Sequence, residues 1–531
     1  MRNFLVLREN QDVTYLKNHD VVPMPISRRI WGFWTFLSFY SIGNVSVATW
    51  SAGSSLLSIG INVGEIMGCI VIGNIFICLA YFFVSAPGYD FHVGYTMLQR
   101  VIFGIRGCYL GILIRILLSI VWYASDAWMG GLILGNIFSS WSSDYFNLTN
   151  TFSESVPFSR KDLIGFVLFQ LIQLPFFLIR PEKLRFLIHV GCVTCFFSML
   201  GLTIWAVALN GGDDGPLMDT PNTLAPSAHG WAWISGVTSW YGSLLTGIVN
   251  SSDYTRFSKN TRSSWAGVPV GNLVMGTVIP LMGLATASAL DGKYDEQFWT
   301  PSQIMDQILT NDYSPKARAA VFFCAFGVLT SQLAINVVGN GISGGTDIAG
   351  LLPKFFNIRR GAIATALLSW AACPWLYYNS SSNFYLVMSA FSVFLSPFVG
   401  IIVCEHWIKR KRTIKLSDLY TFDSDGIYYY TKGFNWQNII IWIIGFAPGV
   451  PGLVKSVNTN AHVNSGIINY FQGNSLFGFC ISFFLCYISG LIFPSTVSTE
   501  IDEVDEFDTF TEQEAADLGV IPYDASAIKE F

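Results

Sequence analysis

Residues 106–138 read RGCYLGILIRILLSIVWYASDAWMGGLILGNIF. This run is long and apolar enough to cross a bilayer, which takes about 20 apolar residues in a helix. Beyond Arg106 at its start, it nevertheless contains two charged side chains, Arg115 and Asp126. On one helix these two would share a face but lie about 16 Å apart along the axis, too far for a salt bridge. The run therefore predicts a membrane-spanning helix whose two charges do not neutralise each other.

Similar apolar runs recur along almost the whole chain. Of its 531 residues, 52% are hydrophobic and only 12% are charged, whereas a soluble protein has about 25% charged residues. The pattern predicts an all-α polytopic membrane protein, because lipid offers no partner to unpaired backbone amides. The composition excludes a disordered chain, a nucleic-acid binder and a disulfide-built secreted module.

Twelve transmembrane helices are expected, near residues 31–58, 64–86, 106–138, 162–179, 186–209, 231–250, 267–290, 319–340, 361–378, 384–404, 437–454 and 474–493. They follow a tail at 1–30 and are divided as follows. Residues 31–404 form a ten-helix core with repeat one at 31–209 and repeat two at 231–404. A loop at 405–436, two extra helices at 437–493 and an acidic tail at 494–531 complete the chain.

The first and sixth spans contain small and polar residues that weaken a helix. The first has Gly43-Asn44 and the SAGSS run at 51–55, and the sixth has Tyr241-Gly-Ser and Thr246-Gly. Paired interruptions in two halves indicate a transporter's substrate site. Because these spans stand five apart, they predict two five-helix repeats of opposite orientation.

The distribution of basic residues predicts the topology. With a cytoplasmic N-terminus, most of the 30 Lys and Arg residues fall in inner segments, so the positive-inside rule places both termini in the cytoplasm. A plasma-membrane location is expected, with lipids as partners. The acidic tail at 494–531 is either solvated or a docking segment for a regulatory partner.

Several segments resemble the nucleobase–cation symporter family, notably its fungal uracil, uridine, allantoin and thiamine permeases. They are RRIW at 28–31, FGIRG at 103–107, WYASDAWMGG at 122–131, NSSDYTRF at 250–257, LLPKFFNIRRG at 351–361 and LSDLY at 416–420. The resemblance implies a leucine-transporter-type fold of five plus five inverted helices, which imports a small heterocycle together with a cation.

The resemblance also implies a substrate pocket. Its helix-3 Trp matches Trp122, its helix-8 Asn matches Asn340, and its helix-3 Gln position is occupied by Asp126. The helix-6 aromatic has no exact counterpart, and Trp240 or Tyr241 is expected to serve. Ser41 and Asn44, at the break in the first span, are the remaining candidates, because carbonyl groups freed there could hold a cation or the substrate.

Asp126 supports two hypotheses, because a mid-membrane carboxylate costs about 2.5–3.5 kcal/mol and is seldom idle. In the first, it is the counter-ion of a cationic heterocycle such as thiamine or nicotinamide riboside, which stacks on Trp122 one helical turn away. In the second, it binds the coupling proton, and the substrate is neutral, such as uracil, uridine or allantoin.

The coupling ion is expected to be a proton. A sodium site in this fold draws hydroxyls from helix 8, but the matching positions here are Ala334 and Ile335, which carry none. No cofactor or metal site is expected.

Four further charged residues, Asp253, Arg256, Asp347 and Arg360, are candidates for gating or structure. Inner-loop cations are explained by topology and lipid contact, and the two carboxylates are candidates to pair with them as a cytoplasmic gate.

Other functional classes are less compatible with the sequence. The six His residues have no H-E-x-x-H or other ligand spacing, and no G-x-S-x-G or P-loop motif occurs. An enzyme is therefore not expected. A channel or a non-transporting nutrient receptor of the same fold stays open at this point.

Overall fold

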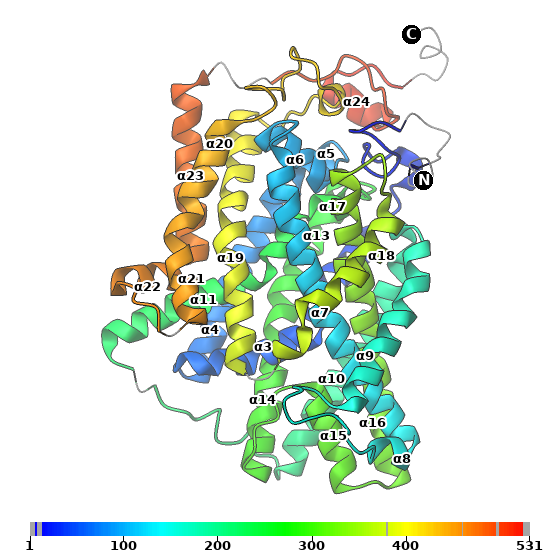
Figure 1. Ribbon diagram of the computed structural model, residues 1–531, viewed down its shortest axis with the longest axis vertical. Coiled ribbons are helices and arrows are strands. Elements are labelled where there is room, and N and C mark those ends of the chain that lie inside the picture. The colour runs from blue at the N-terminus through cyan, green and yellow to red at the C-terminus, as the bar shows by residue number, and fades with distance from the viewer. Residues whose placement is uncertain are drawn as a thin grey trace.

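The computed structural model describes residues 6–7, 13–222, 224–378, 381–458, 460–494 and 499–523. Long helices run roughly along one axis and form a single bundle, and the segments nearest both chain ends lie at the same end of it (Figure 1). β pairing among the described residues is confined to isolated bridges.

The helical elements are as follows, with η marking 3₁₀ or π segments. Up to residue 209 they are η1 Ile26–Arg28, α2 Phe33–Asn44, α3 Val47–Leu56, η2 Leu57–Ile59, α4 Val63–Val84, α5 Ala86–Asp90, α6 Tyr95–Phe103, α7 Cys108–Trp141, α8 Ser143–Phe146, α9 Arg160–Gln173, η3 Leu174–Leu178, η4 Pro181–Leu184 and α10 Arg185–Leu209. Beyond it they are α11 Pro226–Val249, α12 Ser252–Thr255, α13 Thr261–Ala266, η5 Pro269–Met275, α14 Gly276–Tyr294, α15 Pro301–Asn311, α16 Pro315–Ala334, η6 Ile335–Ile342, α17 Ser343–Leu351, α18 Ile358–Leu368, η7 Ser369–Ala372, η8 Pro374–Leu376, α19 Ser381–Val403, η9 Cys404–Lys409, η10 Ser417–Tyr420, α20 Trp436–Phe446, η11 Ala447–Gly449, α21 Val450–Val457, α22 Ser465–Gln472, α23 Asn474–Ile492 and α24 Glu512–Leu518.

Nine helical segments in the described residues are long and apolar enough to cross a membrane. They are Val63–Val84, Cys108–Trp141, Arg160–Leu178, Pro181–Leu209, Thr261–Tyr294, Pro315–Leu351, Ala390–Lys409, Trp436–Val457 and Asn474–Ile492. Each coincides with one expected span. The first, sixth and ninth expected spans correspond to α2 with α3, to α11, and to α18 with its short 3₁₀ extensions. The all-helical membrane class is confirmed, and the total of twelve spans stays a prediction.

The first span is broken next to the expected position. Helix α2 ends at Asn44 and α3 begins at Val47, where the Ser46 hydroxyl accepts a hydrogen bond from the Thr49 N–H at 3.4 Å. The 51–55 stretch lies inside α3 without interruption. The break therefore follows Gly43-Asn44 alone.

The expected interruption inside the sixth span is wrong. Helix α11 continues unbroken from Pro226 to Val249, and the chain turns only at Asn250, before α12. Glycine here serves packing, because a Cβ at Gly242 would lie 2.7 Å from the Ser392 side chain of α19. Small residues in membrane helices often allow such close approach without breaking the helix.

A different irregularity interrupts the eighth span. Helix α16 passes into a π-helical segment, η6, before the regular turns of α17 resume. Single π turns inside α-helices occur frequently at functional sites. This segment contains Asn340, one of the residues expected in the pocket.

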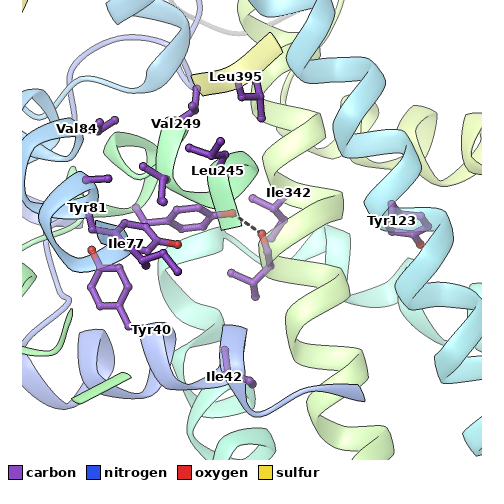
Figure 2. Packing of buried hydrophobic residues seen from close by; sticks show 14 of the residues in the cluster. Tyr40, Ile42, Ile77, Tyr81, Val84, Tyr123, Leu245, Val249, Ile342 and Leu395 are labelled. Atoms are coloured by element: carbon purple, nitrogen blue, oxygen red, sulfur yellow. Dashed lines mark hydrogen bonds between the residues drawn. The ribbon is translucent and has the colours of Figure 1, made fainter. Parts of the chain in front are cut away.

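Tyrosine side chains pack beside these irregular segments. The Tyr40 and Tyr81 rings meet edge to face at 5.1 Å between centroids, and the Tyr254 hydroxyl donates to the Val338 carbonyl at 2.8 Å. Figure 2 shows this cluster between the broken first span and the helix that bears Ile342. Aromatic packing thus ties the two interrupted elements to the rest of the bundle.

The described part of the acidic tail is docked on the end of the bundle that holds the N-terminal segment (Figure 1). Glu514 of α24 pairs with Arg29 at 2.9 Å, and Phe510 contacts the Phe91 ring at 6.1 Å between centroids. Asp502 accepts the Leu416 N–H at 2.6 Å. The described part of the tail therefore packs against this chain's own bundle, and a regulatory partner for it stays a prediction.

Candidate functional site

A cavity lies where the interrupted elements meet. Its cavity volume is about 140 Å³, and it lies between helices of the bundle, where small-molecule sites commonly occur. Its walls come from both halves of the first span, from α4, α7, α11, α12, η5 and η6. The lining residues are Phe39, Tyr40, Gly43, Asn44, Ser46, Ala48, Thr49, Ala52, Tyr81, Arg115, Trp122, Asp126, Trp240, Ser243, Leu244, Thr246, Gly247, Asn250, Tyr254, Asn272, Ile335, Gly339 and Asn340.

Five of the seven expected pocket residues line this cavity, namely Trp122, Asp126, Asn340, Trp240 and Asn44. They come from four different elements, α7, η6, α11 and α2. The structure therefore brings together residues that are more than 200 positions apart in sequence.

The other two expected residues, Ser41 and Tyr241, do not line the cavity. Adjacent helical residues point about 100° apart, so Tyr241 turns away from Trp240 and packs near Phe76, 6.4 Å between ring centroids. Ser41 is buried inside α2. Neither contributes to the cavity wall.

The Asp126 carboxylate is held by neutral amides. Asn340 Nδ2 donates to Asp126 Oδ2 at 2.7 Å and to Asn336 Oδ1 at 3.0 Å. Asn336 in turn donates to Gln173 Oε1 at 2.8 Å. Among the described residues, no Lys, Arg or His side chain forms an ion pair with Asp126. The cavity thus contains a carboxylate with hydrogen-bond partners but without a cation.

Trp122 lies one helical turn before Asp126 and shares its face of α7. Its ring packs against Phe391 at 5.5 Å between centroids. The indole N–H is buried and has no hydrogen-bond partner within the described part of the chain. This side chain offers the cavity both a π face and an uncommitted donor.

Trp240 of α11 approaches the cavity from the opposite side. Its indole N–H donates to Asn74 Oδ1 at 2.8 Å, which fixes the ring against α4. Leu244, one turn later on the same helix, also lines the cavity. Of the two aromatic candidates on the sixth span, Trp240 is the one in position.

Asn44 closes the break in the first span. Its Nδ2 donates to the Gly271 carbonyl at 3.0 Å and to Asn272 Oδ1 at 3.1 Å. These bonds connect α2 with η5, the π-helical start of the seventh span. Asn44 therefore both lines the cavity and joins two elements around it.

Arg115 lines the cavity on the same helix as Asp126 but is neutralised elsewhere. Its guanidinium lies 3.8 Å from Asp347 Oδ2 and donates to the hydroxyls of Ser119 and Ser343. With its amide oxygen turned toward Arg115, Asn250 accepts a further bond at 2.6 Å. The prediction that the two charges of α7 do not pair is confirmed.

The gating pairs suggested by the sequence are not formed as expected. Asp347 pairs with Arg115 rather than with an inner-loop cation. Arg256 donates to the main-chain carbonyl of Asp253 at 3.1 Å, not to its carboxylate, whose Oδ1 accepts the Tyr95 N–H. Arg360 is exposed and donates to the Phe355 carbonyl. The reason is geometric, because Arg360 lies in the exposed first turn of α18, whereas both carboxylates are buried.

Comparison with known families decides the class of the protein. The family model described as "Permease for cytosine/purines, uracil, thiamine, allantoin" matches residues 23–478. The chain belongs to this permease family. The match contains every segment on which the sequence resemblance rested, and the protein is a transporter-family member rather than an enzyme.

Three curated relatives of this permease come from Saccharomyces cerevisiae. A thiamine transporter is 39% identical over 525 residues, which cover 99% of this chain and 87% of the relative. Nicotinamide riboside transporter 1 is 38% identical over 519 residues, covering 98% and 86%. A uridine permease is 31% identical over 530 residues, covering 96% and 82%.

The fold of the permease is that of a solved transporter. Mhp1, a nucleobase-cation-symport-1 family transporter captured closed with bromovinylhydantoin bound, superposes with a TM-score of 0.71 at 19% identity. The superposition covers 94% of this chain and 98% of that one. At this identity the likeness concerns the fold alone.

Two further residues organise the permease cavity, and sequence reasoning missed the first of them, Gln332. Gln332 donates to the Asp126 carbonyl at 3.4 Å and accepts the Val47 N–H at 3.3 Å, bridging α7 and the break in the first span. Ser331 donates to the Val45 carbonyl at 2.6 Å. A signal for Gln332 existed, because it lies four and eight residues before Asn336 and Asn340, on one helical face.

Proposed function

We propose that this permease imports a small cationic heterocycle of the thiamine or nicotinamide riboside class together with a proton. The observation that carries the proposal is the Asp126 carboxylate, which lines the cavity and is bound by Asn340 rather than by a cation. A buried charge without a partner is costly. A positively charged substrate would supply the missing partner.

Trp122 and Asn340 complete the recognition. A cation held over an indole ring at a desolvated site contributes about 2 kcal/mol, and Trp122 lies one turn from Asp126. Asn340 already donates to the carboxylate at 2.7 Å and so orients it. The relatives named for thiamine and nicotinamide riboside are more similar to this chain than the one named for uridine.

A proton is the favoured coupling ion. The break in the first span exposes the Val45 carbonyl, but the Ser331 hydroxyl donates to it at 2.6 Å. Ala334 and Ile335, one turn further along, offer no side-chain oxygen. Because sodium needs several hard oxygen ligands, this region suits proton coupling better.

The architecture that goes with this proposal has twelve spans in two inverted five-helix repeats plus two extra helices. Both termini would face the cytoplasm of a plasma-membrane protein. Docking of the acidic tail beside the N-terminal segment is consistent with termini on one side.

The test is a competition panel in yeast cells that lack their own permeases. Uptake of labelled thiamine and nicotinamide riboside is measured against unlabelled uracil, uridine and allantoin. We expect mutual competition between the two cations and none from the neutral compounds. Competition by neutral compounds alone would replace this proposal with a neutral-substrate symporter, in which Asp126 carries the proton.

Two variants sharpen the panel. Asp126→Gln should abolish cation uptake, whereas Asp306→Asn, a change at an outer carboxylate that pairs with Lys161 at 3.1 Å, should leave it unchanged. Binding without accumulation in reconstituted vesicles would instead identify a receptor.

A further inference from the structure

A second buried carboxylate lies outside the cavity wall and has no role in the substrate site. Asp347 of α17 is fully buried and does not line the cavity. Its helix, α17, lies toward the end of the bundle that also holds α6 and the docked tail (Figure 1). Its nearest cation is Arg115, with 3.8 Å between Nη1 and Oδ2.

Arg115 has more hydrogen-bond partners than Asp347 does. Arg115 donates to Ser119, to Ser343 and to the Asn250 amide oxygen, all neutral groups. Asp347 receives one long hydrogen bond, from the Ser119 hydroxyl to Oδ2 at 3.4 Å. Its Oδ1 has no partner among the described residues. Although Arg115 Nε also has no partner among the described residues, the guanidinium has three neutral acceptors, whereas the carboxylate has one long hydrogen bond.

Such an environment favours reversible protonation. An ionised carboxylate in an apolar interior needs several donors or a close cation to offset its lost hydration. The protonated acid is neutral and gains an O–H that can donate to a neighbouring oxygen. Asp347 can therefore accept a proton at little cost, which frees Arg115 from the one carboxylate that it contacts within the described residues.

The other ionisable groups around Asp347 come from three neighbouring helices. From α12 and its flank come Asp253 and Tyr254, from α6 comes Tyr95, and from α7 come Arg115 and Cys108. Asp253 Oδ1 accepts the Tyr95 backbone N–H at 2.9 Å, and the Arg256 guanidinium lies beside it. Asp253 Oδ2, like Asp347 Oδ1, has no hydrogen-bond partner among the described residues. Within this part of the chain, however, Asp347 has neither a backbone donor nor a second cation, which distinguishes it from Asp253.

Arg115 connects Asp347 with the cavity. The guanidinium and its acceptor Asn250 both line the cavity wall, whereas Asp347 lies behind them. A substrate that fills the cavity therefore meets Arg115 but not the carboxylate. A change in the position of Arg115 is the physical means by which binding and protonation influence each other.

We propose that Asp347 takes up the proton that this permease moves with its substrate, and that Arg115 couples this carboxylate to the cavity. This assignment rests on the proposed proton symport. It separates two tasks, because Asp126 neutralises the substrate while Asp347 exchanges a proton with the solution on each side in turn. The bond formed is the Asp347 O–H, and its proton leaves to water in the later half of the cycle.

The experiment uses the purified full chain in proteoliposomes with labelled thiamine. Two modes are compared, namely accumulation driven by an imposed inward proton gradient, and counterflow exchange at equal pH. Asp347→Asn should lose gradient-driven accumulation, so that the inside-to-outside ratio falls to about one, and should keep counterflow. Retained counterflow also demonstrates that the variant is folded.

Asp253→Asn and Asp347→Glu are the matched variants. Asp253→Asn should still accumulate thiamine, and Asp347→Glu should do so with a shifted pH profile. Accumulation by Asp347→Asn, or its loss in Asp253→Asn alone, would overturn the assignment while proton symport stands. If the wild-type protein exchanges thiamine but does not respond to the gradient, proton symport itself is wrong, and the assignment falls with it.

Discussion

Two buried carboxylates are associated with the same helix, α7: Asp126 belongs to it and lines the cavity, whereas Asp347 pairs with its Arg115 and lies outside the cavity wall. Asp126 lines the cavity and is bound at 2.7 Å by the neutral amide of Asn340. Asp347 is sealed behind the cavity and faces a guanidinium at 3.8 Å, with few hydrogen bonds of its own. One carboxylate thus has donors without a cation, and the other has a cation without adequate donors.

This difference indicates what each group can bind. A carboxylate that is open to the cavity and ordered by amides can accept a whole cationic ligand. A carboxylate enclosed by protein can accept only the smallest cation, a proton. The membrane environment enforces the distinction, because neither charge can be left to bulk water.

The largest effect is expected from removing Arg115, the cation that faces Asp347. Arg115→Met leaves Asp347 without its guanidinium and should lower the free energy of unfolding by about 3–5 kcal/mol, as breaking a buried pair does. Denaturant unfolding in detergent measures it. The double variant Arg115→Met/Asp347→Asn should recover most of the lost free energy of unfolding. If the single and the double variant are equally unstable, the pairing is contradicted.

In the cavity, Asp126→Asn should weaken thiamine binding rather than lower the stability of the fold. Truncating one partner of a buried charge pair costs about 2–5 kcal/mol, so the Kd should rise by about 30-fold or more. Equilibrium binding to purified protein measures the change, with Asp306→Asn as the control. An unchanged Kd would mean that Asp126 is not the counter-ion.

A smaller effect is expected from the aromatic neighbour of Asp126. Trp122→Leu removes the π face and should raise the Kd for thiamine by about 2- to 30-fold, since cation–π contacts contribute about 0.5–2 kcal/mol. Trp122→Phe should lose less, because a ring remains. Trp141→Leu, at an exposed position of the same helix, is the control. Equal losses for Leu and Phe would show that the π face does not hold the cation.

The smallest effect concerns a third carboxylate, Glu514, which has a close cation and partial solvent contact. Burial alone would raise its pKa, but His92, the Thr511 N–H and Arg29 outweigh burial and lower the pKa of Glu514 to about 2. The docked tail is therefore stabilised above about pH 4.5, the usual pKa of a Glu, and loses this contribution as the pH falls toward 2.

Hydrogen exchange in residues 499–523 measures tail docking. Glu514→Gln should increase exchange at neutral pH by up to about 5-fold, as expected for a partly exposed ion pair, and should remove the response to acid. Glu512→Gln, in the same helix turn but outside this ion pair, is the matched control. Faster exchange in both variants would show that the Arg29 contact does not hold the tail.

Much of the fold was predictable because a membrane makes composition informative. The apolar run at 106–138 coincides with α7, and the break after Gly43-Asn44 occurs within two residues of its expected place. The sixth span was misjudged because glycine weakens a helix only if nothing packs against it. The space beside Gly242 is instead occupied by Ser392 of α19, and no local sequence pattern reveals this contact.

The sequence by itself determined the class of the protein, its helices, and the charge that stands out inside them. A carboxylate and a tryptophan four residues apart on one helix must share a face, so Asp126 and Trp122 were local inferences. The tertiary structure decided which partners they meet. Only folding brings Asn340 to Asp126 and Asp347 to Arg115, because hydrogen bonds and ion pairs depend on distances between elements that lie more than 200 residues apart.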